Sequence, residues 1–277
     1  MEKHVEKIWG SEDWIINGDY CGKKLNLKKG FQCSIHYHTR KDEHFYIMSG
    51  AVLFEKHLNL FLKRKNELKI LEKGDDVHIN RFEPHRFIGI EDSEIIEFST
   101  HHEDSDSTRL TMSGPCRGDK AVFIDRDGTI VEDGPYNADP DKVKLFDDVG
   151  ASIKKLNDAD FLVIMVTNQS GIGRGYFTET QMNRVNKRIK NEIRKSGGCI
   201  DAIYHCPHTP EEKCYCRKPN PGMILQAYYD YGINLFDSYM IGDTTSDVLT
   251  AIKCGLKPFY VKDISFVESV EAILNES

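Results

Sequence analysis

The first hundred residues alternate between short apolar runs and turn-forming residues. The runs are rich in β-branched or aromatic residues, and no convincing helical period appears between residues 30 and 100. The predicted strands are 30–38, 44–56, 58–71, 75–79, 85–90 and 93–100. Many short strands at near-regular spacing are typical of a β-sandwich or a small barrel. The pattern predicts an all-β domain over residues 1–112.

Beyond a polar, turn-rich stretch at 101–120, apolar runs alternate with helical segments. A capping box at Thr178 and Gln181 begins one helix, which should stop near Gly197. Two more predicted helices are 220–232 and 246–255, each with a Gly at its end. The apolar runs that predict buried parallel strands are 121–124, 161–166, 237–241 and 258–261. After a linker at 113–119, residues 120–277 are therefore expected to form an α/β Rossmann-like domain.

Composition narrows the function classes. The chain has 277 residues, a formal charge of −7 and a pI near 5.9, which argues against a nucleic-acid partner. The N-terminus has no apolar core, and the run 161–166 is too short to span a bilayer, so a cytoplasmic protein is expected. Disulfides are rare in that compartment, so clustered cysteines point to metal binding or chemistry.

Polar side chains with phosphate or metal chemistry stand at the ends of predicted strands and at a helix start. Asp125 and Asp127 directly follow the run 121–124, and two carboxylates at i and i+2 can point into one crevice. Alone, a solvated acidic turn explains them equally well. Three further sets stand at comparable positions: Thr167 with Asn168, Lys218, and Asp243 with Asp247. All are expected on one face of the sheet.

With these sets in order, residues 119–265 resemble the haloacid dehalogenase (HAD) superfamily of phosphotransferases. The matching motifs are DRDGT, the Thr of VTNQSG, the Lys of CRKP, and GDTTSD. The resemblance implies that Asp125 attacks phosphorus and forms an aspartyl-phosphate. Asp127 would protonate the leaving oxygen and then accept a proton from the attacking water. Thr167 and Lys218 would hold the phosphoryl oxygens.

The same resemblance implies a magnesium site. Its ligands would be Asp125, the backbone carbonyl of Asp127, and Asp243, because Mg²⁺ favours oxygen ligands. Asn168 is expected to bind substrate. Asp247 would support Lys218 or the metal shell, and a first-turn carboxylate favoured by the helix dipole is the equal alternative.

The segment CPHTPEEKCYCRKP concentrates soft ligands beside two cations. Cys206 and His208, followed by Cys214 and Cys216, match a closed tetrahedral zinc site. Four ligands leave no open position, so the predicted zinc is structural, and it would fix the loop that carries Lys218. The alternative is a set of reduced, buried or reactive cysteines.

This loop resembles the zinc-containing HAD branch that includes heptose-1,7-bisphosphate 7-phosphatases and histidinol-phosphate phosphatases. Arg174 and Arg217 are then expected to bind a second anionic group, although a solvated loop cation also explains Arg174. Thr244 departs from the branch, which often has a basic residue there. No large cap is expected, and residues 132–146 should form a flap in which Tyr136 and Asn137 could contact substrate.

The N-terminal domain carries a second set of metal ligands. His36 and His38 alternate along a strand and therefore share a face, and Glu43 and His85 could complete a site for a divalent transition metal. The spacing resembles the cupin first motif, and residues 5–110 resemble the cupin of type II mannose-6-phosphate isomerases and mannose-1-phosphate guanylyltransferases. Asn80 and Phe82 stand where that family usually has Pro and Gly. The resemblance implies metal binding, sugar-phosphate binding or isomerisation, and a homodimer through the cupin.

The leading hypothesis is an Mg²⁺-dependent sugar-phosphate phosphatase fused to a cupin, acting on D-glycero-D-manno-heptose 1,7-bisphosphate. The alternatives are a histidinol-phosphate phosphatase and a phosphosugar-binding or scaffold protein. A nucleic-acid 3′-phosphatase is disfavoured by the acidic charge balance. The complete set of core phosphatase residues disfavours an inactive scaffold.

Overall fold

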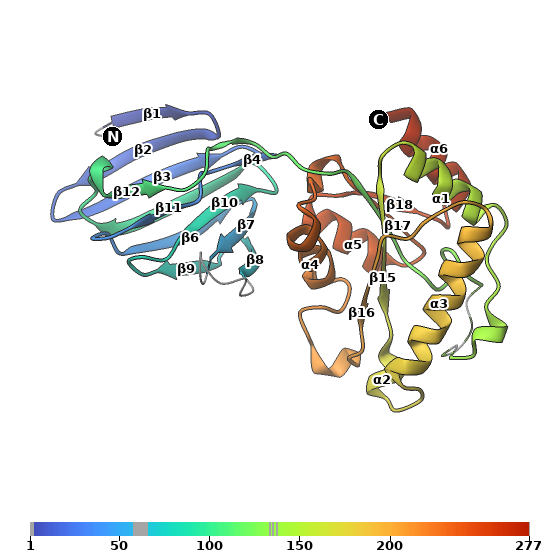
Figure 1. Cartoon of the computed structure of the whole chain (residues 1–277). Helices are drawn as coiled ribbons and strands as arrows, with labels where there is room; N and C mark the ends of the chain where they lie inside the picture. Colours follow the sequence, from blue (N-terminus) through green and yellow to red (C-terminus); the bar gives the residue numbers. More distant parts are fainter. Residues whose placement is uncertain (1–2, 58–65, 133, 135, 137, 277) are drawn as a thin grey trace. The chain divides into compact units, whose positions relative to one another are not determined.

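The computed structural model describes residues 3–57, 66–132, 134, 136 and 138–276 (Figure 1). The chain divides into two compact units, Met1–Cys116 and Arg117–Ser277. Within the predicted linker 113–119, strand β13 (Gly114–Pro115) pairs with a strand of the N-terminal unit. No helix among the described residues is long and apolar enough to cross a membrane.

The N-terminal unit consists of two antiparallel sheets. One has the order β1-β2-β3-β11-β6-β9, and the other has the order β12-β5-β10-β4-β13, with β7 pairing to β10 and to β8. The strands are β1 Lys3–Lys7, β2 Gly10–Asn17, β3 Tyr20–Leu27, β4 Phe31–Gln32, β5 His36–His38, β6 Glu43–Ser49, β7 Ala51–Lys56, β8 Glu67–Glu72, β9 Asp76–Ile79, β10 His85–Gly89, β11 Ser93–Thr100 and β12 Ser107–Arg109. The antiparallel architecture agrees with the predicted β domain, and its assignment as a cupin stays a prediction.

Two predicted strands are each divided, and five strands of this unit, β1 to β3, β12 and β13, were not predicted. The run 30–38 becomes β4 and β5, and the run 44–56 becomes β6 and β7, which turn at Gly50 with φ +78°. Of the run 58–71, residues 58–65 lie outside the described residues. The alternation of apolar and polar residues did not predict strands β1 to β3, because the polar residues Asp13 and Lys23 are buried in them. Trp9, Phe45, Phe54 and Phe87 belong to the core that the sheets enclose.

The C-terminal unit is a five-stranded parallel sheet with the order β16-β15-β14-β17-β18. Helices α1, α3 and α6 cover one face, and α4 and α5 cover the other (Figure 1). The elements are β14 Ala121–Ile124, α1 Val149–Asp158, β15 Leu162–Asn168, α2 Ser170–Gly173, α3 Glu179–Lys195, β16 Ala202–Cys206, α4 Gly222–Tyr231, β17 Tyr239–Gly242, α5 Thr245–Cys254, β18 Lys257–Tyr260 and α6 Phe266–Glu276. The predicted α/β fold is confirmed.

The helix ends follow the local chemistry that predicted them. Thr178 and Gln181 form the reciprocal capping box of α3, and Gly232 and Gly255 end α4 and α5 in the left-handed conformation. Strand order places β14 between β15 and β17. Because the three strands are parallel, their carboxyl ends meet at one edge of the sheet, which is where ligands bind in open α/β folds.

Candidate active site

Lys218 is the centre of the charge cluster at this edge. Its Nζ lies 2.5 Å from Asp125 Oδ1 and 2.6 Å from Asp247 Oδ1, and it donates to the carbonyl of Val166 at 2.9 Å. Burial alone would lower the pKa of Lys218, but the two carboxylates outweigh burial and raise it. Burial raises the pKa of Asp125 to about 7, with Lys218 opposing the shift and Asp247 adding to it. The loop before α4 thus brings a cation against the tip of β14.

Asp243 completes an acidic cluster after β17. Oxygens of Asp125, Asp243 and Asp247 all lie within 4.8 Å of one another, and Asp243 Oδ1 is buried without a hydrogen-bond partner. Burial, followed by the charge of Asp247, raises the pKa of Asp243. Gly128 has φ +78°, and a Cβ there would meet Asp243 Oδ2 at 2.4 Å, so only glycine permits this approach. A hard, oxygen-rich and net-negative cluster of this kind fits Mg²⁺.

Asp247 has two tasks. Its Oδ2 accepts from the backbone N–H of Thr244 at 3.0 Å and from the Thr244 hydroxyl at 2.6 Å, which forms the cap of α5. Its Oδ1 faces Lys218. The two interpretations raised for Asp247, a helix-end carboxylate and a support for Lys218, therefore describe the same side chain. Thr244 is directed at Asp247, so the departure from a basic residue gives the helix a cap.

The side chain of Asp127 contacts two residues, Arg126 and Gln169. Arg126 Nε lies 3.0 Å from both carboxylate oxygens of Asp127, and its Nη2 lies 2.9 Å from Oδ2. Gln169 Nε2 donates to Asp127 Oδ2 and to Thr167 Oγ1, each at 2.8 Å. Sequence reasoning did not single out Arg126 or Gln169, although both stand inside the quoted motifs DRDGT and TNQSG.

Asn168, expected to bind substrate, is bonded to the backbone of Lys218. Its Nδ2 donates to the Lys218 carbonyl at 3.2 Å, and its Oδ1 accepts from the Lys218 N–H at 3.1 Å. The pair joins the end of β15 to the loop that carries the lysine. The geometry supports a positioning role for Asn168.

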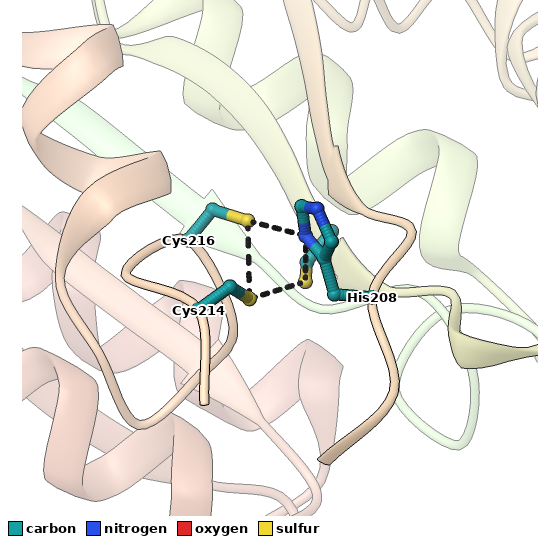
Figure 2. A group of neighbouring side chains, drawn as sticks. His208, Cys214 and Cys216 are labelled. Atoms are coloured by element: carbon teal, nitrogen blue, oxygen red, sulfur yellow. Dashed lines mark hydrogen bonds between the residues drawn. The ribbon is translucent and has the colours of Figure 1, made fainter. Parts of the chain in front are cut away.

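The predicted zinc ligands converge (Figure 2). The Sγ atoms of Cys206 and Cys214 are 3.4 Å apart, and those of Cys214 and Cys216 are 3.5 Å apart. His208 Nδ1 lies 3.3 Å from Cys216 Sγ and 3.7 Å from Cys206 Sγ. Tetrahedral zinc with ordinary bond lengths separates ligand atoms by about 3.5 to 3.8 Å. The four residues fit a closed zinc site.

The two arginines expected to bind a second anionic group contact the segment 206–216, which carries the four predicted zinc ligands and is called the zinc loop below. Arg217 Nη1 donates to the His208 carbonyl at 3.3 Å, and Arg174 Nη2 lies 3.5 Å from Glu211 Oε1. In the predicted flap, Tyr136 makes an edge contact with Tyr176, with ring centroids 4.6 Å apart. Asn137 lies outside the described residues.

The N-terminal unit contains a cavity of about 320 Å³ lined by His36, His38, Glu43 and His85. Glu43 lies 3.5 Å from His38 Nε2 and 3.5 Å from His85 Nε2. The Nδ1 atoms of His36 and His85 each contact a backbone carbonyl at 2.9 Å, so these nitrogens carry the proton and leave Nε2 free. Burial lowers the pKa of His85 to about 4, which keeps the imidazole neutral.

Two features of this cavity differ from a closed metal site. Among the described residues, the groups whose ligand atoms all lie within 4.8 Å are the zinc-loop and aspartate clusters, and the histidine set is wider. Lys41, which was not predicted to take part, donates to Glu43 Oε1 at 2.8 Å and to Glu97. His85 Nε2 is nevertheless buried without a hydrogen-bond partner. The residues therefore fit a metal bound by imidazoles, with one oxygen of Glu43 taken by Lys41.

The departure at Phe82 has a structural consequence. Phe82 adopts φ +64° and remains exposed, and its N–H donates to the His38 carbonyl at 2.7 Å. The backbone at this position thus adopts the left-handed conformation that glycine favours, although a phenylalanine occupies it.

A family model matches one segment of the chain, and three known proteins each match about half of it. A family model described as HAD-hydrolase-like matches residues 215–264. The probable D-glycero-D-manno-heptose-1,7-bisphosphate 7-phosphatase of Thermoplasma volcanium is 43% identical over 124 residues, which cover 45% of this chain and 85% of that protein. The D-glycero-beta-D-manno-heptose-1,7-bisphosphate 7-phosphatase of Haemophilus ducreyi is 43% identical over 147 residues, which cover 50% of this chain and 81% of that protein. A crystal structure of D,D-heptose 1,7-bisphosphate phosphatase from B. bronchiseptica, in complex with magnesium and phosphate, is 28% identical with a TM-score of 0.54, and the match covers 57% of this chain and 99% of that chain.

Proposed function

The chain belongs to the family of HAD-like phosphatases that contains the D-glycero-D-manno-heptose-1,7-bisphosphate 7-phosphatases, and from this premise we propose that it hydrolyses the 7-phosphate of such a heptose bisphosphate. It is a phosphomonoesterase. The observation that carries the proposal is the contact of Lys218 with Asp125 and Asp247 beside Asp243. A buried nucleophile next to one ammonium group and further carboxylates is the arrangement that phosphoryl transfer needs.

Four side chains would carry out the two steps of the reaction. Asp125 forms a bond to phosphorus while the bond from phosphorus to the leaving oxygen breaks, and Asp127 gives that oxygen a proton. Water then attacks the aspartyl-phosphate and passes its proton to Asp127, which restores both aspartates and releases inorganic phosphate. Lys218 and Thr167, both nearly inaccessible to solvent, would orient the phosphoryl oxygens.

Asp125, Asp243 and the backbone carbonyl of Asp127 would hold Mg²⁺. When bound, the ion neutralises negative charge on the phosphoryl group. The unpartnered Asp243 Oδ1 supports this assignment, and Asp247 remains with Lys218 and the α5 cap.

Two arginines near the zinc ligands bear on substrate choice. Arg217 and Arg174 lie on or beside the zinc loop and would bind the anionic group distal to the reacting phosphate. The family membership favours a heptose bisphosphate over histidinol phosphate. Hydrolysis rates over a panel of sugar mono- and bisphosphates, with histidinol phosphate included, decide between the two substrates.

Replacing Asp125 tests the proposed reaction. We expect Asp125→Asn to abolish Mg²⁺-dependent phosphate release, because an amide cannot form the acyl phosphate, while circular dichroism shows an intact fold. Asp158→Asn, an exposed change on α1, is the matched control and should retain activity. If Asp125→Asn kept most of the wild-type rate, the nucleophile assignment would be wrong.

For the N-terminal unit we propose a cupin that holds a divalent transition metal and binds or isomerises a sugar phosphate. The cavity supports this proposal, since apolar Trp9, Phe45 and Phe87 face polar His36 and Glu43 around it. A phosphosugar-binding module without turnover is the alternative, and an isomerisation assay with the same panel separates the two. Cytoplasmic residence and dimerisation through this unit remain proposals as well.

A further inference from the structure

Arg126 is a buried cation between the two aspartates of the first motif. It is 2% exposed and is the largest of the nearly inaccessible side chains among the described residues. Its ion-pair partner in that part of the chain is Asp127, bound through Nε and Nη2 at 2.9 to 3.0 Å. Desolvating a guanidinium group is unfavourable, and a buried ion pair is weak support for stability. The arrangement therefore calls for a role beyond holding the fold together.

The far side of Arg126 is anchored to a helix. Its Nη1 donates to Asn186 Oδ1 at 3.1 Å, and Asn186, itself buried on α3, contacts Met182 Sδ at 2.9 Å. This contact ties the guanidinium group of Arg126 to α3. Since α3 is a capped helix of 17 residues, the anchor is rigid.

Gln169 approaches the same carboxylate from another element. It is 5% exposed, and its amide nitrogen uses two N–H donors, one on Asp127 Oδ2 and one on Thr167 Oγ1. A primary amide is suited to this bridge because it carries two donors on one atom. Gln169 therefore ties the residue expected to move the proton to a residue expected to bind the phosphoryl group.

We propose that Arg126 and Gln169 are positioning residues that hold the Asp127 carboxyl in a fixed orientation for proton transfer. The inference rests on the proposed function, in which Asp127 serves the leaving oxygen and then the attacking water. Arg126 and Gln169 touch neither substrate nor phosphorus in this scheme. Asp127 is 27% exposed and would otherwise sample several rotamers, so two fixed donors reduce its freedom.

The leaving group provides the test. The ratio kcat/KM reports steps up to departure of the leaving group, and 4-nitrophenolate leaves without a proton whereas a sugar alkoxide needs one. Correct placement of a general acid contributes about 10²- to 10⁴-fold. In Arg126→Met and Gln169→Leu, kcat/KM for a sugar monophosphate should fall by about 10²-fold, while kcat/KM for 4-nitrophenyl phosphate should fall by less than about 5-fold. Arg126→Lys, which retains the positive charge but has a single donor nitrogen in place of the planar guanidinium group, should give an intermediate loss.

A purely structural role would lower both ratios by the same factor, and that result would overturn the proposal. Gln169→Leu leaves the Arg126–Asp127 pair in place, so it carries the test if Arg126→Met unfolds, as judged by the thermal midpoint. Arg188→Gln, which changes an exposed residue on α3, is the control and should leave kcat/KM unchanged for both substrates. If Asp125→Asn still hydrolysed 4-nitrophenyl phosphate, the proposed function itself would be wrong. If Asp125→Asn were inactive but Arg126→Met and Gln169→Leu lost kcat/KM equally for both substrates, only the positioning role would be refuted.

Discussion

Both ends of the Asn168 side-chain amide are bonded to the backbone of Lys218, and this fact changes the role expected for the residue. As a substrate ligand, Asn168 would act mainly through KM. As a brace between β15 and the zinc loop, it sets the position of the Lys218 backbone and therefore the reach of Nζ toward Asp125. The two roles make opposite kinetic predictions.

Asn168→Ala should lower kcat by roughly tenfold, because it removes two hydrogen bonds of about 1 kcal/mol each and loosens Lys218. KM for the same substrate should change by less than twofold. Steady-state kinetics with a sugar monophosphate measures both constants. A raised KM with unchanged kcat would restore the substrate-binding interpretation.

At the same scale, the sequence predicts residues more readily than it predicts their partners. Asp125, Lys218 and Asp243 stand at strand or helix ends, and this placement alone brings them to one edge of the sheet. The pairing of Gln169 with Asp127 depends on how the short helix α2 turns the chain after β15, and no periodicity encodes that turn. Arg126 carried one usable signal, a cation between two functional carboxylates.

At the scale of elements, prediction succeeded where local chemistry fixes a boundary. The capping box of α3 and the glycines after α4 and α5 satisfy backbone groups within a few residues, so their effect is visible in the sequence. Strand β16 was missed because it lies at the edge of the sheet and four of its five residues are only half buried. Strands β1 to β3 were missed because buried polar residues break the apolar alternation.

The zinc loop is the element that depends most on a ligand. Its segment between His208 and Cys214 is polar and partly exposed, so a bound ion would supply the ordering energy that packing cannot. Cys214→Ser should remove about one zinc per chain, as measured by inductively coupled plasma mass spectrometry, and should lower phosphatase activity because Lys218 follows the loop. Cys199→Ser changes an exposed cysteine outside the loop and should keep the zinc. If Cys214→Ser and Cys199→Ser contained equal amounts of zinc, the assignment of the zinc site would be wrong.

A second element, the turn after β5, is held by Asp106. Its carboxylate accepts from the backbone N–H groups of Thr39, Arg40 and Lys41 at 3.0 to 3.2 Å and from the Thr39 hydroxyl at 2.6 Å. Asp106→Asn replaces one acceptor oxygen by a donor that faces these N–H groups. The free energy of unfolding should fall by about 1.5 to 3 kcal/mol, the range for hydrogen bonds to a charged group. Urea denaturation measures the change in the free energy of unfolding. Asp104→Asn changes an exposed side chain and should stay within about 0.5 kcal/mol of wild type.

At the scale of the whole molecule, each unit has its own hydrophobic core and its own set of metal-type ligands. The zinc and aspartate clusters belong to the C-terminal unit, and the histidine cavity belongs to the N-terminal unit. If the N-terminal cavity binds a transition metal, the purified protein should hold that metal in addition to zinc. A substitution there should change metal content and leave phosphate release unaltered.

His38→Ala is the sharpest form of this prediction. His38 is 4% exposed and lines the cavity 3.5 Å from Glu43, so its loss leaves two imidazoles and the oxygen of Glu43 that Lys41 does not hold. Such a set binds a divalent transition metal weakly, and the second metal should disappear while zinc and the kcat for a sugar phosphate stay at wild-type values. His44→Ala, on an exposed histidine paired with Asp76, is the matched control and should retain both metals. A wild-type protein that contains one zinc per chain and no further transition metal would contradict the metal assignment and would favour a metal-free cavity in which Lys41 is the cation beside Glu43.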